Sequence, residues 1–519
     1  MEKNFKIKDP RFLLILPPLQ FRTEEMIRPD GSLALAYLCA ALTEAGFHSE
    51  ILDMSVGTST DCLEDTFYRR VEISTAMSRV GMSQERIIEE VQGFDVIAIS
   101  SIFTQQTSRC FEVSNMIKDI FPGKILIAGG CNARTLKEHF FKNGFDFVFL
   151  SEGERTIVMF ANFLHSGNPP LSKISGIAFK NNNKTIVNPE YEVISNLDKI
   201  PIPSWEKLPN QKYWEIGRVW GGRDGWMKKD GLVQYSSMFT SMGCPFKCHY
   251  CHISNEQGGE SGNIGSFRAH SVERVEQEFE KLQRMGVNYL YINDDSFLAN
   301  KKRVFKILEL LKKYSFKLAD VNGVNIINLY KRQDNKYVVD EDLLYSLYEA
   351  GFRKISLPFE SGSQRILDKY SLKKWNLERC DSIDLIKKLN EVGIVADGNF
   401  MIGYPDEDLE ELTNSFLLAK KQMDAGMIAC QFFMVQPFPG SALFDESVAN
   451  GQLSPSWDWN EMGWSKGSQF NHPKIDKNIL KYCWGLVWKL LNNEDRVKEF
   501  TKQLAGNKNK ENLTNSFSI

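Results

Sequence analysis

The feature that most constrains this chain is a short cysteine loop, Cys244-Pro-Phe-Lys-Cys248-His-Tyr-Cys251. Its three thiols have the spacing C-x-x-x-C-x-x-C and follow an apolar run and the turn residue Gly243. Four thiolates complete the ligand set of an iron–sulfur cubane. Three thiols from one loop therefore leave one iron open, as a catalytic metal keeps a free position. An open iron can chelate a small molecule and pass it an electron, so the loop predicts a reactive site.

A structural zinc site is the alternative interpretation, with His249 or His252 as the fourth ligand. Zinc sites usually pair one C-x-x-C with a second pair further along the chain, and no such partner pair occurs in the sequence. The outer cysteines show no ligand spacing, and we expect most of them to be small core residues. They are Cys39, Cys62, Cys110, Cys131, Cys380, Cys430 and Cys483.

Bulk composition limits the classes of protein that this chain can form. Apolar residues make up 42% of its 519 residues, enough for packed cores. A formal net charge of −3 provides no global footprint for nucleic acid. The longest apolar stretch, Leu33 to Leu42, is too short to span a bilayer. Ten cysteines without a visible signal peptide indicate a reducing compartment. We therefore expect a cytoplasmic protein without nucleic-acid or membrane partners.

Residues 11–165 alternate short apolar runs with helical periodicity, which predicts a doubly wound parallel α/β sheet. The helical patterns include Leu33–Ala45 and Ser108–Ile120. The expected strands are Phe12–Leu16, Ser49–Leu52, Val96–Ser100, Ile125–Ala128 and Phe147–Leu150. Ligands bind such sheets at the carboxyl ends of the strands, and glycines in the loops there let backbone approach a ligand closely. The pattern predicts a large ligand at that edge.

Strand and helix alternate again over residues 233–440, which predicts a partial (β/α)6 barrel with its site at the carboxyl ends of the strands. Ser271 is the expected N-cap of the first helix, and Gly286 is expected to end it. The expected strands are Val233–Thr240, Val287–Asn293, Lys317–Val324, Lys354–Pro358, Ile394–Met401 and Ile428–Val435. The cysteine loop follows the first of them, where the barrel rule places chemistry.

Residues 166–232 interrupt this rhythm with prolines, a polar run at Lys180–Lys184 and several tryptophans, and we interpret them as a linker containing a hairpin. The tryptophans either cover a site or anchor the linker, and anchoring is slightly favoured. Residues 441–504 are expected to be mostly helical. The polar residues 505–519 are expected to form a disordered tail.

The cysteine loop, with Tyr250 before its last cysteine, resembles the signature of the radical S-adenosylmethionine (SAM) superfamily. This resemblance implies a [4Fe-4S] cluster on Cys244, Cys248 and Cys251. Carboxylates beside a cationic ligand form charge-assisted hydrogen bonds, and the resemblance assigns such roles at the strand ends. It implies Asp294 and Asp295 for the SAM ammonium, Glu360 for the ribose, and Tyr250 for the adenine. The full implied SAM set is Tyr250, Asp294, Asp295, Glu360, Ser361, Gly398 and Gly403.

The first third is similar to the cobalamin-binding domain of cobalamin-dependent radical SAM enzymes, through PP, SSIFTQQ, GGCNA and SEGERT. The implied cobalamin contacts are Pro17, Pro18, Ser100, Ser101, Thr104, Gln105, Gly129, Gly130, Glu152 and Gly153. Domains of methionine-synthase type place a cobalt-ligating histidine in D-x-H-x-x-G, and this chain has Ser55 at that position, two residues after Asp53. The departure implies cobalt without a histidine lower ligand. A Rossmann-like domain that binds nothing is the alternative, because a shared fold does not guarantee a shared ligand.

Taken together, the resemblance to class B-type members implies a methyltransferase that moves a methyl group from SAM via methylcobalamin to an unactivated carbon. The runs ISSIF, GG-x-x-AR and FNHP resemble phosphonate-methylating members, which implies a natural-product or phosphonate-like small molecule as substrate. An external low-potential electron donor is implied, and no catalytic side chain need be invoked. A cyclase or ring-rearranging enzyme has the same motifs and stays an alternative, as does a non-catalytic cobalamin or redox sensor.

Overall fold

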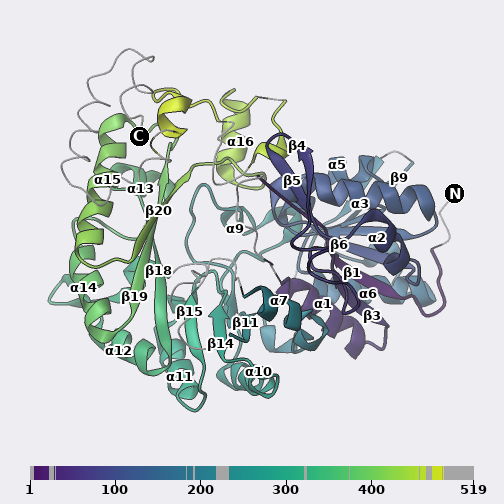
Figure 1. Cartoon of the computed structure of the whole chain (residues 1–519), viewed down its shortest axis with the longest axis horizontal. Helices are drawn as coiled ribbons and strands as arrows, with labels where there is room; N and C mark the ends of the chain where they lie inside the picture. Colours follow the sequence, from purple (N-terminus) through teal and green to yellow (C-terminus); the bar gives the residue numbers. More distant parts are fainter. Residues whose placement is uncertain are drawn as a thin grey trace.

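The computed structural model describes residues 5–22, 29, 31–182, 184–190, 193–217, 233–320, 324–372, 374–454, 456–462, 470–481 and 483. Two α/β units dominate it: a twisted sheet built from the first third of the chain and a crescent of strands built from the second half (Figure 1). The prediction of a doubly wound domain followed by a partial barrel is confirmed.

The first unit is a seven-stranded sheet in the order β10-β9-β8-β7-β6-β1-β3. Its parallel strands are β1 (Phe12–Leu16), β3 (Ser49–Asp53), β6 (Val96–Ser100), β7 (Ile125–Gly129) and β8 (Phe147–Phe149). Helices α1 (Leu33–Glu44) and α6 (Gly153–Ser166) pack on one face. Helices α2 (Gln84–Val91), α3 (Thr107–Ile120), α4 (Cys131–Thr135) and α5 (Lys137–Lys142) complete the unit. The chain order of the parallel strands reverses between β1 and β6, and this switch point is where ligands bind in such folds.

Strand β1 illustrates why the sheet needs helices on both faces. Successive side chains of a strand point to opposite faces, and here both sets are apolar. Phe12 and Leu14 belong to the core beside α1 and α6, whereas Leu13 and Ile15 belong to the core beside α2 and α3. A strand that is apolar on both faces is typical of a buried parallel sheet.

Two features of this unit were not expected. The hairpin predicted near Lys180–Lys184 forms, but its strands β9 (Ile177–Asn181) and β10 (Lys184–Asn188) extend the first sheet. The sheet thus continues beyond residue 165, where the sequence analysis ended the domain. A separate antiparallel sheet of β2 (Leu19–Arg22), β5 (Met77–Val80) and β4 (Arg70–Ser74) also lies in this part of the chain.

The second unit is a six-stranded parallel sheet in the order β11-β14-β15-β18-β19-β20. The strands are β11 (Tyr235–Met238), β14 (Tyr289–Ile292), β15 (Lys317–Asp320), β18 (Phe352–Glu360), β19 (Val395–Ile402) and β20 (Ala429–Met434). The helices α10 (Val272–Arg284), α11 (Lys301–Leu311), α12 (Glu341–Glu349), α14 (Ser382–Val392) and α15 (Leu409–Asp424) lie along its outer side (Figure 1). Shorter helices are α9 (His252–Asn255) and α13 (Gln364–Tyr370), and β16 (Tyr330–Gln333) pairs with β17 (Lys336–Val339).

Helix α10 begins and ends as its sequence predicts. The Ser271 side chain accepts a hydrogen bond from Arg274 N at 3.1 Å, which satisfies a free donor of the first turn. Val275, Phe279 and Leu282 recur on one face and are fully buried. Gly286, at φ +86°, follows the helix in the left-handed conformation that glycine adopts without strain.

The linker is anchored between the two units. Trp205, in the 3₁₀ turn η4 (Trp205–Lys207), is fully buried and donates to Ser237 O at 3.0 Å. Trp214, in α7 (Asn210–Ile216), donates to Tyr235 O at 2.7 Å. The anchoring interpretation is therefore confirmed for these two residues. Trp220 and Trp226 lie outside the described residues.

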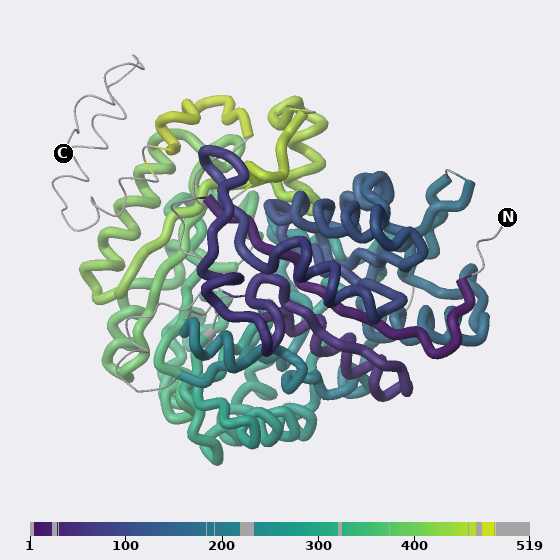
Figure 2. Tube along the Cα trace, turned by 45° about the vertical axis from the view of Figure 1, so that its right-hand side comes forward, coloured from purple at the N-terminus to yellow at the C-terminus, as the bar shows by residue number. Residues whose placement is uncertain are grey.

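After β20 the chain returns toward the first unit. Helix α16 (Ala442–Ala449) and the 3₁₀ turn η8 (Trp459–Glu461) lie over the junction of the two units, in the yellow part of the trace (Figures 1 and 2). Most of the predicted helical segment after residue 462 and the whole predicted tail, 505–519, lie outside the described residues. None of the described helices has the length and apolar content needed to cross a membrane.

A buried carboxyl after β19 leads to the first prediction. Glu407 is fully buried and accepts from Gly403 N at 2.6 Å, and burial raises the pKa of Glu407 from 4.5 to about 8. Between those values the folded state binds the extra proton, so this group stabilises the fold at low pH and the stabilisation is lost as pH rises toward 8. We expect Glu407→Gln to gain about 3 kcal/mol relative to wild type between pH 6 and pH 9.

Urea midpoints at the two pH values measure this difference. Glu410→Gln is the matched control, because Glu410 is exposed in the first turn of α15. A Glu407→Gln difference that is the same at both pH values would contradict the assignment.

Candidate active site

The cysteine loop begins where the barrel's first strand ends. After β11 the chain forms a short strand pair, β12 (Ser241–Met242) with β13 (Arg268–Ala269). Gly243 follows at φ +75°, and a Cβ there would lie 2.3 Å from Ser266 O. Cys244 N then donates to Gly265 O at 3.0 Å, and Cys251 N donates to Cys248 O at 3.2 Å. Glycine is thus required for the close backbone approach that starts the loop.

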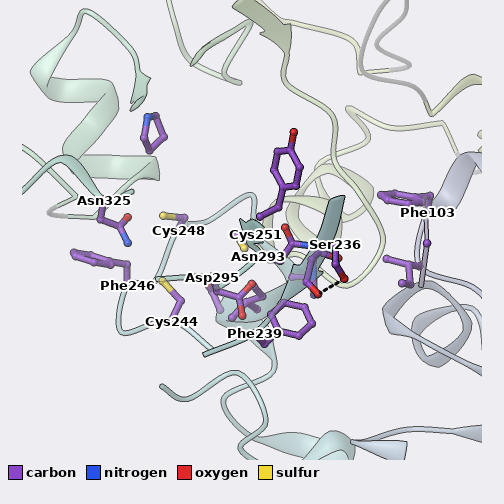
Figure 3. Close-up of a pocket in the computed structure, with 18 of the residues that line it drawn as sticks. Phe103, Ser236, Phe239, Cys244, Phe246, Cys248, Cys251, Asn293, Asp295 and Asn325 are labelled. Atoms are coloured by element: carbon purple, nitrogen blue, oxygen red, sulfur yellow. Dashed lines mark hydrogen bonds between the residues drawn. The ribbon is translucent and has the colours of Figure 1, made fainter. Parts of the chain in front are cut away.

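The three cysteines line one cavity of about 510 Å³ at the carboxyl ends of the barrel strands. Figure 3 shows Cys244, Cys248 and Cys251 from the same loop around this cavity, with Phe246 beside Cys244. Burial raises the pKa of the Cys251 thiol to about 12, and metal coordination deprotonates such a thiol outright. The donor set, three sulfurs from one loop, fits three irons of a cubane and leaves the fourth iron open.

The zinc alternative requires ligands that converge on one ion. Among the described residues, no three His, Cys, Asp or Glu side chains are grouped closely enough to hold one metal ion. The cysteine ligands of a cubane each bind a different iron, so they need not converge on one point. The arrangement of the loop therefore favours the cluster.

The two aspartates after β14 have different environments. Asp295 lines the cysteine cavity and accepts from Gly243 N at 2.9 Å, and burial raises the pKa of Asp295 to about 6. Asp294 is fully buried and accepts from Thr240 N and Thr240 Oγ1, both at 2.6 Å, and from Ser241 Oγ at 2.5 Å. The Asp294 carboxylate thus holds the chain after β11 in place, whereas Asp295 lines the cavity. Contact of either aspartate with the SAM ammonium stays a prediction.

Glu360 is held by a cation that the sequence analysis did not identify. Its carboxylate pairs with Lys374 Nζ at 2.7 Å, and Lys374 lines the cysteine cavity. Burial by itself lowers the pKa of Lys374, but the negative charges of Glu360 and Cys248 outweigh burial and hold that pKa above its usual range. Glu360 also has φ +65°, at the register shift that ends β18. Such backbone costs about 1–3 kcal/mol and is often found at ligand sites.

Ser361, Gly398 and Gly403 of the implied SAM set are not among the residues that line the cysteine cavity. Ser361 is fully buried and its hydroxyl accepts from Ser363 N at 3.1 Å. A Cβ at Gly398 would lie 2.7 Å from the Met427 sulfur, and a Cβ at Gly403 would lie 3.0 Å from Leu480. Both glycines leave no room for a side chain of their own, because the Met427 and Leu480 side chains pack against them.

Tyr250 joins the cysteine cavity to a second cavity of about 460 Å³ at the strand ends of the first sheet. Its hydroxyl lies 3.3 Å from Ser371 Oγ. Of the implied cobalamin contacts, the second cavity is lined by Pro17, Ser100, Ser101, Thr104 and Gln105. These residues follow β1 and β6, the switch point of the sheet, as the fold rule predicts.

The remaining implied contacts support this wall indirectly or join the domains. A Cβ at Gly130, where φ is +102°, would lie 2.4 Å from Ser101 O, so glycine lets two wall loops touch. Gly129 O accepts from Ser101 N at 2.8 Å, and Pro18 packs 3.3 Å from where a Cβ of Gly81 would be.

Glu152 and Gly153 do not line the second cavity, and their contact with cobalamin stays a prediction. Glu152 forms a two-pronged ion pair with Arg268 of the barrel, at 2.5 and 2.9 Å. A Cβ at Gly153 would lie 2.6 Å from Leu38, so its small size permits α6 to pack on α1. Both residues therefore have interface and packing positions.

Ser55, at the position of the missing histidine, is fully buried and donates to Asp53 Oδ1 at 2.6 Å. The other oxygen of Asp53 accepts from Tyr213 OH of the linker at 2.7 Å. Because Asp53 accepts from Ser55 beside it and from Tyr213 of the linker, this carboxylate connects the linker to the first sheet. A cobalt without a histidine lower ligand stays a prediction.

The two cavities meet along shared walls. Phe103 of the first domain and Phe239, Tyr250, His252 and Asn293 of the barrel line both of them. Figure 3 shows Phe103 opposite the cysteine loop. The space therefore runs from three thiols to the switch point of the first sheet, with aromatic side chains between. Hydroxyl, amide and backbone groups around the second cavity fit a large polar ring system such as a corrin.

Known families match both units. Residues 238–419 match the Radical SAM superfamily and residues 31–161 match the B12 binding domain. The fold and the cysteine loop thus define an enzyme of the radical SAM class.

Sequence relatives and a solved structure of the same fold indicate which members of this class the chain resembles. The cytidylyl-2-hydroxyethylphosphonate methyltransferase of Streptomyces wedmorensis is 26% identical, over 88% of this chain and 85% of its own. An uncharacterized methyltransferase of Pyrococcus horikoshii, PH0819, is 28% identical, over 86% of this chain and 85% of its own. The radical SAM methyltransferase TsrM of Kitasatospora setae shares the fold, with a TM-score of 0.63 and 16% identity, over 86% of this chain and 79% of its own. The chain therefore combines a B12-binding domain with a radical SAM domain, and it is similar to cobalamin-dependent radical SAM methyltransferases. Its cofactors are a [4Fe-4S] cluster, SAM and cobalamin.

Lys374 and Met462 could not be found by reading motifs. Lys374 lies in a loop with no pattern of its own, and only its distance to Glu360 identifies it. Gln106 and Asn132 line the second cavity together with Met462, which is over 300 residues further along the chain. The run Gln105-Gln106 was a visible signal for the first of these.

The cysteine loop leads to a direct prediction. We expect anaerobically prepared protein to contain about four iron and four sulfide per chain, the content of one cubane. Changing Cys244, Cys248 and Cys251 together to alanine should remove both, as measured by iron and sulfide analysis and by the visible absorbance. Cys430→Ala is the control, since Cys430 is a buried core residue outside the loop. Stoichiometric zinc without sulfide would contradict the cluster.

The Glu360–Lys374 pair leads to another prediction. Removing one partner of a buried pair leaves an uncompensated charge and costs about 3–5 kcal/mol, so both Glu360→Gln and Lys374→Met should destabilise the protein. The double variant removes both charges and should recover most of this stability. If Glu360 holds the SAM ribose, the double variant should still bind SAM more weakly by about 1.5–3 kcal/mol for each charged hydrogen bond lost.

Urea unfolding and SAM titration of the reconstituted variants separate the two roles. The pair Lys354–Asp397, buried at 2.9 Å between β18 and β19, is the matched control. Its double variant should leave SAM affinity unchanged. Normal SAM affinity in the Glu360→Gln/Lys374→Met variant would remove Glu360 from the ribose site.

Proposed function

We propose that this enzyme transfers a methyl group from SAM to an unactivated carbon of a small, polar molecule. The observation that carries the proposal is the continuous space between the cysteine loop and the switch point of the first sheet, which Tyr250, Phe103 and Phe239 line from both sides. A substrate in that space would lie between both cofactor sites. When bound, the cluster supplies an electron to SAM, and cobalamin supplies a transferable methyl group.

In this proposal, the residues of the chain bind and orient SAM and keep water away from the reaction. Lys374 and Glu360 would provide one cation and one anion at the end of β18, for the carboxylate and the ribose of SAM. Asp295 would accept from the SAM ammonium. The aromatic wall of Phe103, Phe239 and Tyr250 would exclude water from the shared space, which protects a reactive intermediate from side reactions.

The cavity that holds the cysteine loop also has polar lining residues. They are Asn210 of the linker and Ser236, Tyr291 and Asn325 of the barrel. Such amide and hydroxyl groups can orient a polar small molecule by a few hydrogen bonds. The relative of Streptomyces wedmorensis carries a phosphonate in its name, so a phosphonate-like or other natural-product substrate is proposed here. An external low-potential electron donor is required.

The test is anaerobic turnover with methyl-labelled SAM and a reductant. Cytidylyl-2-hydroxyethylphosphonate is the first defined compound to supply, followed by a small-molecule extract. We expect label in a new carbon-bound methyl group and formation of 5′-deoxyadenosine, with neither from the triple-cysteine variant. Formation of 5′-deoxyadenosine without label in any product would favour the cyclase or ring-rearranging alternative. Failure of both with all cofactors bound would favour a cobalamin or redox sensor.

A further inference from the structure

The segment 436–462 follows the last barrel strand and lies outside both family matches, which end at residues 161 and 419. It nevertheless lines the second cavity through Phe438, Pro439 and Met462. Met462 directly follows the 3₁₀ turn η8, which packs on α3 of the first domain. A part of the chain that neither domain model includes therefore closes one side of the cobalamin cavity.

The turn η8 is fixed to the first domain by a specific set of hydrogen bonds. Asn460 Oδ1 accepts from Ser108 Oγ at 2.6 Å and from Gln20 Nε2 at 2.8 Å. Trp459 Nε1 donates to the same Ser108 hydroxyl at 2.9 Å. The indole ring of Trp459 also packs edge-on against Phe111, with 5.6 Å between ring centroids. One amide oxygen thus binds two donors that lie on different elements of the first domain.

One of those donors also holds the cavity loop. Gln20 N donates to Gln106 Oε1 at 2.7 Å, and Gln106 Nε2 donates to Gln20 O at 2.9 Å. Gln20 Nε2 reaches Gln105 O at 2.5 Å as well. Gln105 and Gln106 line the second cavity, and Gln20 is almost fully buried. Asn460 therefore completes a network whose other end is the wall of the cobalamin site.

We propose that Met462, held by the turn η8 before it, forms part of the wall of the cobalamin site and that Asn460 is the positioning residue that holds this turn against the loop 104–106. The inference rests on the proposed function, because it takes cobalamin as the group in the second cavity. It adds that bound cobalamin dissociates only when η8 separates from Ser108 and Gln20. The two domain cores alone do not complete the site.

The test measures how fast cobalamin leaves the protein, without turnover. Protein loaded with hydroxocobalamin is diluted and filtered at intervals, and the released corrinoid is read by its absorbance. Asn460→Leu removes the acceptor oxygen, and we expect its dissociation rate constant to rise about tenfold, which corresponds to about 1.4 kcal/mol. Asn460→Asp keeps an acceptor oxygen for Ser108 and Gln20, so it should release cobalamin more slowly than Asn460→Leu.

Ser454→Ala is the matched control on the same segment, because Ser454 is exposed and its hydroxyl pairs with Ser456 Oγ at 2.9 Å. It should release cobalamin at the wild-type rate. Equal cobalamin dissociation rate constants for Asn460→Leu and wild type would contradict the role of Asn460 at the wall of the site. Wild-type protein that binds no cobalamin would instead overturn the proposed function.

A second variant keeps the inference testable if Asn460→Leu does not fold. Trp459→Phe keeps an aromatic ring beside Phe111 but removes the indole donor to Ser108, so we expect a rise of about threefold in the dissociation rate constant. Iron content and the thermal midpoint of each variant should match wild type, since the cluster lies on the barrel loop. If cobalamin release rises only in step with a lower thermal midpoint, η8 is a general anchor and the inference is wrong.

Discussion

The arrangement of the site depends on one buried arginine at the contact of the two domains. Arg268 donates to both oxygens of Glu152 and, at 2.8 Å each, to the carbonyls of Ile194 and Ile264. It belongs to β13, whose partner β12 immediately precedes the cysteine loop. A bidentate, mostly buried arginine–carboxylate pair fixes direction as well as distance. The strand ends of the first sheet are therefore held facing the loop that carries the thiols.

This contact is reinforced beside the cysteine loop itself. Arg134, which follows the Gly129-Gly130 turn, pairs with Glu256, and Glu256 Oε1 lies 2.9 Å from His252 Nδ1. Since His252 directly follows Cys251 and lines both cavities, the ion pair connects a loop of the first domain to the end of the cysteine loop. The carboxyl ends of the strands of the two domains thereby face each other across one shared space.

At the strand ends of the barrel, three carboxylates that look alike in the sequence have different partners in the structure. Asp294, Asp295 and Glu360 lie within a few residues of strand ends and look equivalent as carboxylates after strands. The structure separates them by their partners: hydroxyls and a backbone amide for Asp294, a single backbone amide for Asp295, and the Lys374 cation for Glu360. A carboxylate that already has three donors has little capacity left for a ligand. Motif position alone could not make this distinction.

The sequence by itself determined the strands, their alternation with helices and the cysteine loop, because these follow from local periodicity and from thiols close together in the chain. It also identified Pro17, Ser101 and Gln105 as wall residues, since the carboxyl ends of parallel strands meet at one edge. Only the tertiary structure decided that Lys374 pairs with Glu360, that Glu152 binds Arg268, and that Asn460 reaches Gln20. These contacts join residues 14, 116 and 440 positions apart. Their partners are chosen by packing and by the need to satisfy buried polar groups, and neither leaves a periodic signal in the chain.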